Sequence, residues 1–116
     1  MTHGSTDPLA RVRREFARGL PERLDKIRSA LTVLREGFDA LHAEQFHVVS
    51  HALVGMAATF DAHEMAEQAQ VLAQLGRRWR KEGPPTHAEL DEALERVALL
   101  EGTVTAFLRH TDGGGE

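Results

Sequence analysis

The sequence predicts an all-α protein, an antiparallel up-down four-helix bundle with a short additional N-terminal helix. Three observations predict it. Apolar residues recur at helical spacing over most of the chain. Strand signals are missing, since there is no tyrosine and the β-branched residues do not alternate. The 4 prolines and 10 glycines fall almost entirely between the periodic segments. Long helices joined by short loops pack most simply as antiparallel neighbours.

The composition sets the broad class of protein. With 116 residues, the chain is expected to form one domain, at residues 8–109, with a flexible N-terminus at 1–7 and a disordered Gly-rich tail at 110–116. The absence of cysteine excludes disulfides and thiolate metal sites. No apolar run is long enough to span a membrane and no signal-peptide layout is present, so we expect a cytoplasmic protein without membrane contact.

The charge pattern argues against nucleic acid as a partner. The net charge is −4, whereas a general nucleic-acid surface is basic. Basic residues cluster locally at residues 11–14 and 77–81. Such clusters at helix ends usually complement the helix dipole or are solvated, and we interpret them in that way.

Two helices are predicted before residue 37. Asp7-Pro8 is a capping residue followed by proline at the first helical position. Gly19-Leu20-Pro21 is compatible with a break after this short helix or with a bend into the next. The apolar seam of the first bundle helix then consists of Leu20, Leu24, Ile27, Leu31 and Leu34. Gly37 stands where a C-terminal glycine stop belongs.

Three further helices follow. One runs from about Asp39 to about Ala58. The next is preceded by Asp61 and Glu64, which resemble a capping box, and it ends at Gly83-Pro84-Pro85. Its inward residues are predicted to be Met65, Ala69, Leu72, Leu75 and Trp79. Thr86 and Glu89 form a standard capping box before the last helix, whose apolar residues are Leu90, Leu94, Val97, Leu100, Val104, Phe107 and Leu108.

The helix from Asp39 to Ala58 carries the candidate site, His51. At about 100° per residue, one side of this helix collects Phe46, Val49, Leu53, Met56 and Phe60. His51 lies opposite and is therefore predicted to be exposed. Its outer face is poor in long side chains and is the expected partner-binding face, with Glu44, His47, Val54, Gly55 and Ala58. Glycine inside a helix costs about 1 kcal/mol relative to alanine, and a bare face suits a partner that approaches the imidazole closely.

Histidine at this position is chemically suited to carry a phosphoryl group. Imidazole titrates near neutral pH, so a neutral nucleophilic ring is available. Phosphoryl transfer depends mainly on positioning and charge stabilisation, and a carrier therefore needs little machinery. No Gly-rich phosphate loop is present. We therefore expect a phosphocarrier rather than a kinase with its own ATP site.

The stretch around His51 resembles the histidine-containing phosphotransfer (Hpt) domain family, whose motif is His-x-Leu-Lys-Gly followed by small residues and Phe-Gly. Here His51, Leu53 and Gly55 stand in register, followed by Phe60. The resemblance extends from about Phe16 to Leu75, through the small and apolar residues Ala57, Ala58, Ala62, Ala66, Ala69 and Leu72. In two places the sequence departs from the family motif, because the lysine is Val54 and the glycine after the phenylalanine is Asp61.

The resemblance implies a phosphorelay protein. His51 would take a phosphoryl group from one receiver domain's aspartate and deliver it to another's, in a pathway fed by a sensor or hybrid histidine kinase. Mg²⁺ would be held by the receiver, so no cofactor is expected in this chain, and a monomer is expected. By position, Gln70 or Gln74 of the following helix would orient the imidazole, and Arg77 would face the phosphate or the partner. His47 is a candidate cation in place of the missing lysine.

Three other interpretations remain open at this point. His47 and His51 at i,i+4 with Glu44 could converge on a metal ion, although no further ligand pair is set up by spacing, so no metal is assigned. A degenerate Hpt-like adaptor would bind signalling partners without carrying phosphate, as Val54 suggests. His51 could also be a solvated histidine on an ordinary helical bundle.

Overall fold

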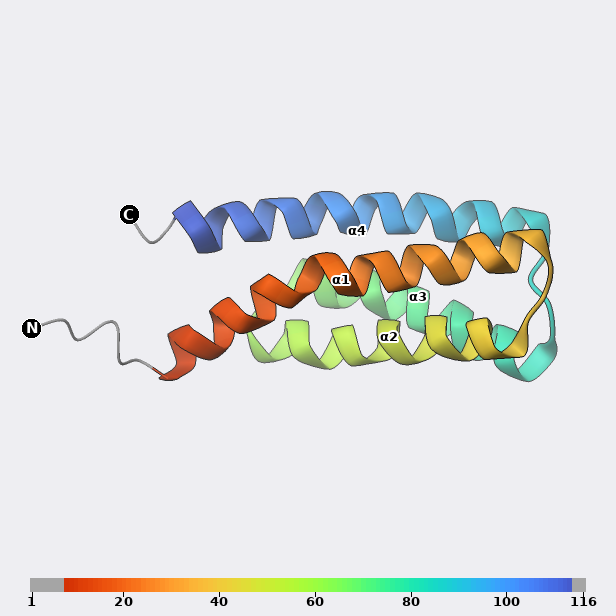
Figure 1. The fold of residues 1–116 in the computed structure, drawn as a ribbon, viewed down its shortest axis with the longest axis horizontal. Coiled ribbons are helices and arrows are strands. Elements are labelled where there is room, and N and C mark those ends of the chain that lie inside the picture. The colour runs from red at the N-terminus through yellow and green to blue at the C-terminus, as the bar shows by residue number, and fades with distance from the viewer. Residues whose placement is uncertain (1–7, 114–116) are drawn as a thin grey trace, which may run out of the picture.

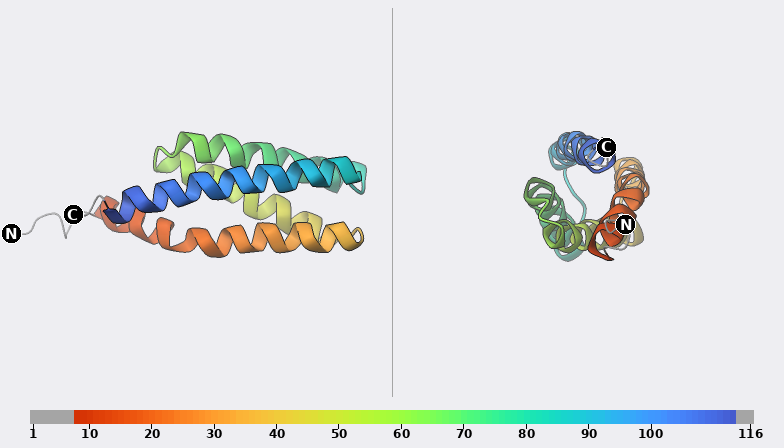
Figure 2. Two further views of the ribbon diagram at one scale, coloured as in Figure 1. Left: turned by 90° about the horizontal axis from the view of Figure 1, so that it is seen from above. Right: turned by 90° about the vertical axis from the view of Figure 1, so that its left-hand side faces the viewer.

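The computed structural model describes residues 8–113, and the side chains of residues 8–110. These residues form four α-helices, α1 (Pro8–Glu36), α2 (Ala40–Thr59), α3 (His63–Glu82) and α4 (His87–Gly113), in up-down order (Figure 1). Each helix packs against two others, in the order α1–α2–α3–α4 and back to α1. The end-on view shows this ring (Figure 2). Within the described range no helix is long and apolar enough to cross a membrane.

The core is built from the apolar rows that helical periodicity predicted. The whole α1 seam from Leu20 to Leu34 is buried, and so are all five predicted inward residues of α3. In the row predicted for α2, Phe46, Leu53 and the following Phe60 are buried, while Val49 and Met56 are partly buried against the core. In α4, four of the seven predicted apolar residues are buried, namely Leu90, Val97, Leu100 and Val104. The other three pack partly exposed against the core.

The predicted short N-terminal helix is wrong as a separate element, because α1 runs without a break through Pro21. Proline lacks the N–H that would donate to the carbonyl one turn earlier, and it normally kinks a helix. The ribbon of α1 bends on the N-terminal side of its middle (Figure 1). Long-range packing holds the first turns in place. Phe16 stacks on Phe60 at 5.0 Å between ring centroids and meets the edge of Phe107 at 5.7 Å. Arg13 also donates to the Phe60 carbonyl.

Two of the predicted helix starts are confirmed in detail. The Asp39 side chain caps α2 by accepting from the Leu41 N–H at 2.9 Å. Before α4, the Glu89 N–H donates to the Thr86 hydroxyl at 3.1 Å, and the Thr86 N–H donates to the Glu89 carboxylate at 2.9 Å. This is the reciprocal pair of a capping box.

The predicted capping box at Asp61 is wrong. The residue that caps α3 is Ala62, and it makes no side-chain cap hydrogen bond. Asp61 instead has φ 59°, in the left-handed region, directly after α2. The Ala62 N–H bonds the Ala57 carbonyl at 2.8 Å and the Asp61 N–H bonds the Ala58 carbonyl at 3.1 Å. This pair of bonds defines a Schellman motif, which closes the C-terminus of α2 rather than opening α3.

The predicted ends of the domain need one correction. The tail was expected from residue 110, but α4 continues to Gly113, because no proline or glycine interrupts the sequence between Gly102 and Gly113. Residues 1–7 and 114–116 lie outside the described part of the chain.

Candidate functional site

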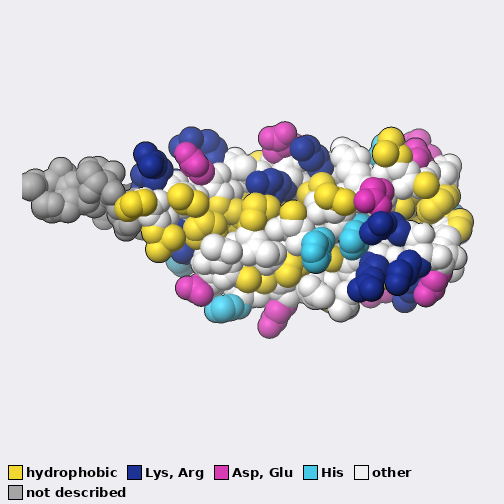
Figure 3. Space-filling view, turned by 90° about the horizontal axis from the view of Figure 1, so that it is seen from below, with side chains coloured by type: hydrophobic (Ala, Val, Ile, Leu, Met, Phe, Trp, Pro, Cys, Tyr) yellow, Lys and Arg dark blue, Asp and Glu magenta, His cyan; other side chains and the backbone are white. Residues whose placement is uncertain are grey.

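His51 is exposed on α2, as predicted, with the buried row of the same helix on its other side. Figure 3 shows the surface formed by α2 and α3, on which histidine side chains lie next to a group of lysine and arginine side chains. The residues that line the surface with His51 come from both helices.

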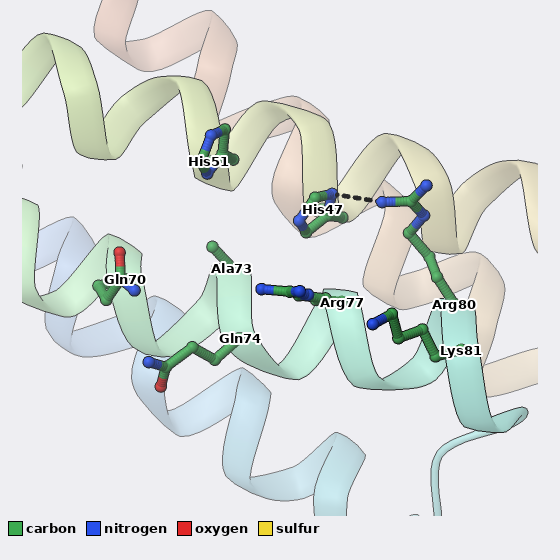
Figure 4. Close-up of a pocket in the computed structure, with 8 residues that line it drawn as sticks. All are labelled: His47, His51, Gln70, Ala73, Gln74, Arg77, Arg80 and Lys81. Atoms are coloured by element: carbon green, nitrogen blue, oxygen red, sulfur yellow. Dashed lines mark hydrogen bonds between the residues drawn. The ribbon is translucent and has the colours of Figure 1, made fainter.

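A cavity of about 350 Å³ lies between α2 and α3 at His51 (Figure 4). The three α3 residues expected near His51, Gln70, Gln74 and Arg77, all line it, together with Ala73. His47, Arg80 and Lys81 complete the lining. No side chain in the described range makes a hydrogen bond to the His51 ring. Gln70 and Gln74 are thus near the ring without being bonded to it. Cationic and amide side chains are the groups that bind anionic oxygens.

Arg80 joins α3 to α2 through two contacts. Its Nε lies 2.6 Å from the Glu44 carboxylate, and its Nη1 lies 3.0 Å from Nδ1 of His47. Guanidinium nitrogens only donate hydrogen bonds, so His47 Nδ1 is the acceptor. The same His47 ring lies nearly parallel to the His51 ring, with 5.7 Å between centroids and 16° between planes.

The surroundings of His47 disfavour the positive charge that the sequence suggested for it. Burial lowers the pKa of His47 below 6.5, and the charges of Arg80, His51 and Arg77 lower it further, against a smaller opposing effect of Glu44. These surroundings favour the neutral form of the imidazole. The cations of the cavity are Arg77, Arg80 and Lys81.

Sequence reasoning missed the role of this basic cluster. Arg80 and Lys81 were assigned to the helix dipole or to solvent, yet both line the cavity with His51. Arg78 points elsewhere and pairs with Glu89 of α4. Helical spacing was the available signal, because Arg77, Arg80 and Lys81 continue the face of α3 that starts at Gln70 and Gln74.

Gly76 is a second feature that was missed. A Cβ at this position would lie 3.0 Å from the Cα and Cβ of His47 and from the Phe46 ring. This is tighter than nine in ten real Cβ contacts, so a side chain at residue 76 would require α2 and α3 to shift by a few tenths of an ångström. Gly76 precedes Arg80 by one turn, and the two residues together fix the side chain of His47 against α3.

Two of the five residues of the expected partner-binding face leave it bare. Gly55 and Ala58 are exposed, and a Cβ at Gly55 would meet nothing within 4 Å. Glu44 is tied to Arg80, and Val54 is partly buried against the core. Val48 and Leu41 were not predicted for this face, but they are exposed apolar residues of the same helix, at 49% and 70%.

A metal site finds no support here. No three His, Asp or Glu side chains of the described residues come together in a way that could hold an ion. Glu44, the third ligand considered from the sequence, is paired with Arg80 instead.

The comparison with known families identifies the kind of helical bundle. The family model described as Hpt domain matches residues 11–100. The chain belongs to the Hpt domain family. Neither the curated proteins nor the solved structures gave a significant match. Membership gives the chain a phosphotransfer role in two-component signalling, a system in which Hpt domains interact with receiver domains and histidine kinases.

The two departures from the Hpt motif have structural explanations. Asp61 replaces the motif glycine at the residue with φ 59°, and aspartate is one of the few other residues that tolerates this conformation. Val54 replaces the motif lysine and is packed partly against the core. The positive charge near His51 in this Hpt domain comes from α3 instead, through Arg77, Arg80 and Lys81.

Proposed function

We propose that this Hpt domain relays a phosphoryl group between receiver-domain aspartates through a phosphohistidine at His51. The observation that carries the proposal is the position of His51, exposed on α2 at a cavity lined by Arg77, Arg80 and Lys81. A nucleophile open to a partner and next to cationic side chains suits the transfer of an anionic group.

The transfer step is a displacement at phosphorus. The lone pair of an unprotonated His51 ring nitrogen forms the N–P bond, while the P–O bond of the receiver's aspartyl phosphate breaks. The electron pair of that bond leaves with the aspartate carboxylate. Delivery to the second receiver is the reverse reaction, with its aspartate as the nucleophile. Arg77 and Lys81 offset the charge of the transferred group on the α3 side of the ring.

The partners in this proposal are receiver domains and the sensor or hybrid kinase that feeds the relay. The receiver supplies the aspartate and Mg²⁺, so the chain itself holds no cofactor, acts as a phosphocarrier and has no ATP site. It works in the cytoplasm as a monomer without nucleic acid or membrane as a partner. The receiver covers the bare surface around His51, Gly55 and Ala58, next to the exposed Val48.

A labelling experiment tests this function. The protein is incubated with a phosphorylated receiver, and acid-labile, base-stable label is followed in the wild type and in His51→Gln. We expect label on the wild type alone. His63→Gln is the matched control, because His63 is also exposed, at the start of α3, and it should label like the wild type. Label that persists in His51→Gln would show that the site is elsewhere.

A second candidate is an adaptor that binds receivers without carrying phosphate. The observation that favours it is Val54, an apolar residue partly buried where the motif has a lysine. The same experiment separates the two functions when binding is measured beside labelling. A protein that binds a receiver but takes no label from it, or from a small phosphodonor such as phosphoramidate, would be the adaptor.

A further inference from the structure

The surroundings of His47 assign it a specific tautomer. Nδ1 of His47 accepts a hydrogen bond from Arg80 Nη1 at 3.0 Å. A neutral imidazole carries one proton, so this proton must be on Nε2. Arg80 cannot turn away freely, since its Nε is held by Glu44 at 2.6 Å. The structure thus makes His47 a hydrogen-bond donor through Nε2–H.

That donor lies beside His51. The two imidazoles are nearly parallel at 5.7 Å, and both line the same cavity. The second ring nitrogen of His47 lies on the side of its ring away from Arg80, towards His51 (Figure 4). The absence of a side chain at Gly76 lets the backbone of His47 lie close to α3.

We propose that His47 is a phosphoryl-binding residue of this site, and that Arg80 is a positioning residue that holds it ready to donate through Nε2–H. The inference rests on the proposed function, because the acceptor is a phosphoryl oxygen on His51. In this chain a neutral imidazole fixed from α3 takes the place of the flexible lysine that Val54 replaces.

The charges around His47 are compatible with this role. Arg80 and Arg77 of α3, His51 of α2 and the burial of the ring all disfavour the imidazolium form, and only Glu44 favours it. A neutral donor has its N–H in a single, known position.

The first test concerns the tautomer and needs no phosphate. Ring ¹⁵N NMR at alkaline pH should show His47 with a protonated Nε2 and a bare Nδ1. His42 is the internal reference, because its Nδ1 lies 2.8 Å from the Asp39 carboxylate and must carry the proton. Arg80→Met should convert His47 to a mixture of tautomers and leave His42 unchanged. A protonated Nδ1 on wild-type His47, or no response to Arg80→Met, would overturn the assignment.

The second test measures where the phosphoryl group resides at equilibrium between a receiver and His51. A hydrogen bond to a charged group is strong, so His47→Leu should shift the distribution towards the receiver by about tenfold or more. His47→Gln keeps an N–H donor and should therefore keep the distribution close to that of the wild type. His63→Leu, the same change at an exposed histidine, should have no effect. Circular dichroism checks that each variant is folded.

The outcomes distinguish this inference from the proposed function. If His47→Leu is labelled at His51 with the wild-type distribution, the donor role of His47 is wrong while the relay function stands. If wild-type His51 takes no label from a receiver or from phosphoramidate, the relay function is wrong and His47 has no phosphoryl group to bind. The tautomer result is decided separately in either case.

Discussion

Gly76 and His47 touch across the α2–α3 interface, where a Cβ on residue 76 would be 3.0 Å from the Cα of His47. Gly76→Ala should therefore force the helices apart and lower the free energy of unfolding by about 1–3 kcal/mol, measured by urea denaturation. Gly102→Ala is the matched control, because it is an exposed helical glycine with nothing within 4 Å and should stabilise by up to about 1 kcal/mol. Equal responses of the two variants would contradict the close contact.

Gly55 should matter for the approach of the receiver rather than for the stability of the fold. Gly55→Leu adds a side chain to open space and replaces glycine with a good helix former. The free energy of unfolding should therefore rise by up to about 1 kcal/mol. The rate of transfer from a receiver should nevertheless fall, and by more than the rate of labelling by phosphoramidate, which is too small to need the bare face. Gly102→Leu should gain similar stability at the wild-type transfer rate. A receiver rate that Gly55→Leu leaves unchanged would place the docking surface elsewhere.

Asp61 occupies a backbone position that favours glycine, with φ 59°. Asp61→Gly relieves this strain and should raise the free energy of unfolding by up to about 1 kcal/mol, less the entropy that glycine gains in the unfolded chain. Asp61→Val should lower the free energy of unfolding by more than about 1 kcal/mol, since a β-branched residue rarely adopts positive φ. Thermal unfolding followed by circular dichroism measures both. If valine proved as stable as glycine, the left-handed turn would be refuted.

The titration of His47 should be visible in the pH dependence of stability. Its pKa in the folded protein is lowered from 6.5, chiefly by burial and then by Arg80. Between the two pKa values the unfolded chain binds more protons, so stability is full above pH 6.5 and is lost as the pH falls through this window. The measurement is urea denaturation across this range, with His47→Gln as the variant in which this contribution disappears.

NMR titration of the His47 ring tests the causes of the shift. Arg80→Met removes a positive neighbour and should raise the pKa of His47 towards 6.5, whereas Glu44→Gln removes the one group that raises it and should lower it further. Shifts of the opposite sign would contradict the electrostatic account.

Periodicity alone predicted most of the fold and part of the site. The approach of Gln70, Gln74 and Arg77 was expected from the resemblance to the Hpt family. The inward rows of α1 and α3 and the exposure of His51 follow from about 100° per residue. These properties depend on one helix, or on two helices packed as neighbours, and so they can be derived from local sequence.

The corrected predictions depended on contacts that a single sequence does not reveal. The helix through Pro21 is held by Phe16, which packs on Phe60 and Phe107 from distant parts of the chain. Asp61 suits either a helix start or a left-handed turn, and the aspartate gives no sign of which is formed. The contacts of Arg80 with Glu44 and His47 depend on the exact register between α2 and α3.

Every side chain of the proposed site belongs to the hairpin of α2 and α3, whereas the two ends of the described chain, at Pro8 and Gly113, belong to α1 and α4. Both ends lie at the same end of the bundle (Figure 1). A fluorophore or an affinity tag attached at either terminus would therefore leave the His51 surface uncovered. Binding and transfer can be measured on tagged protein, and immobilisation through one terminus would present His51 to a receiver in solution.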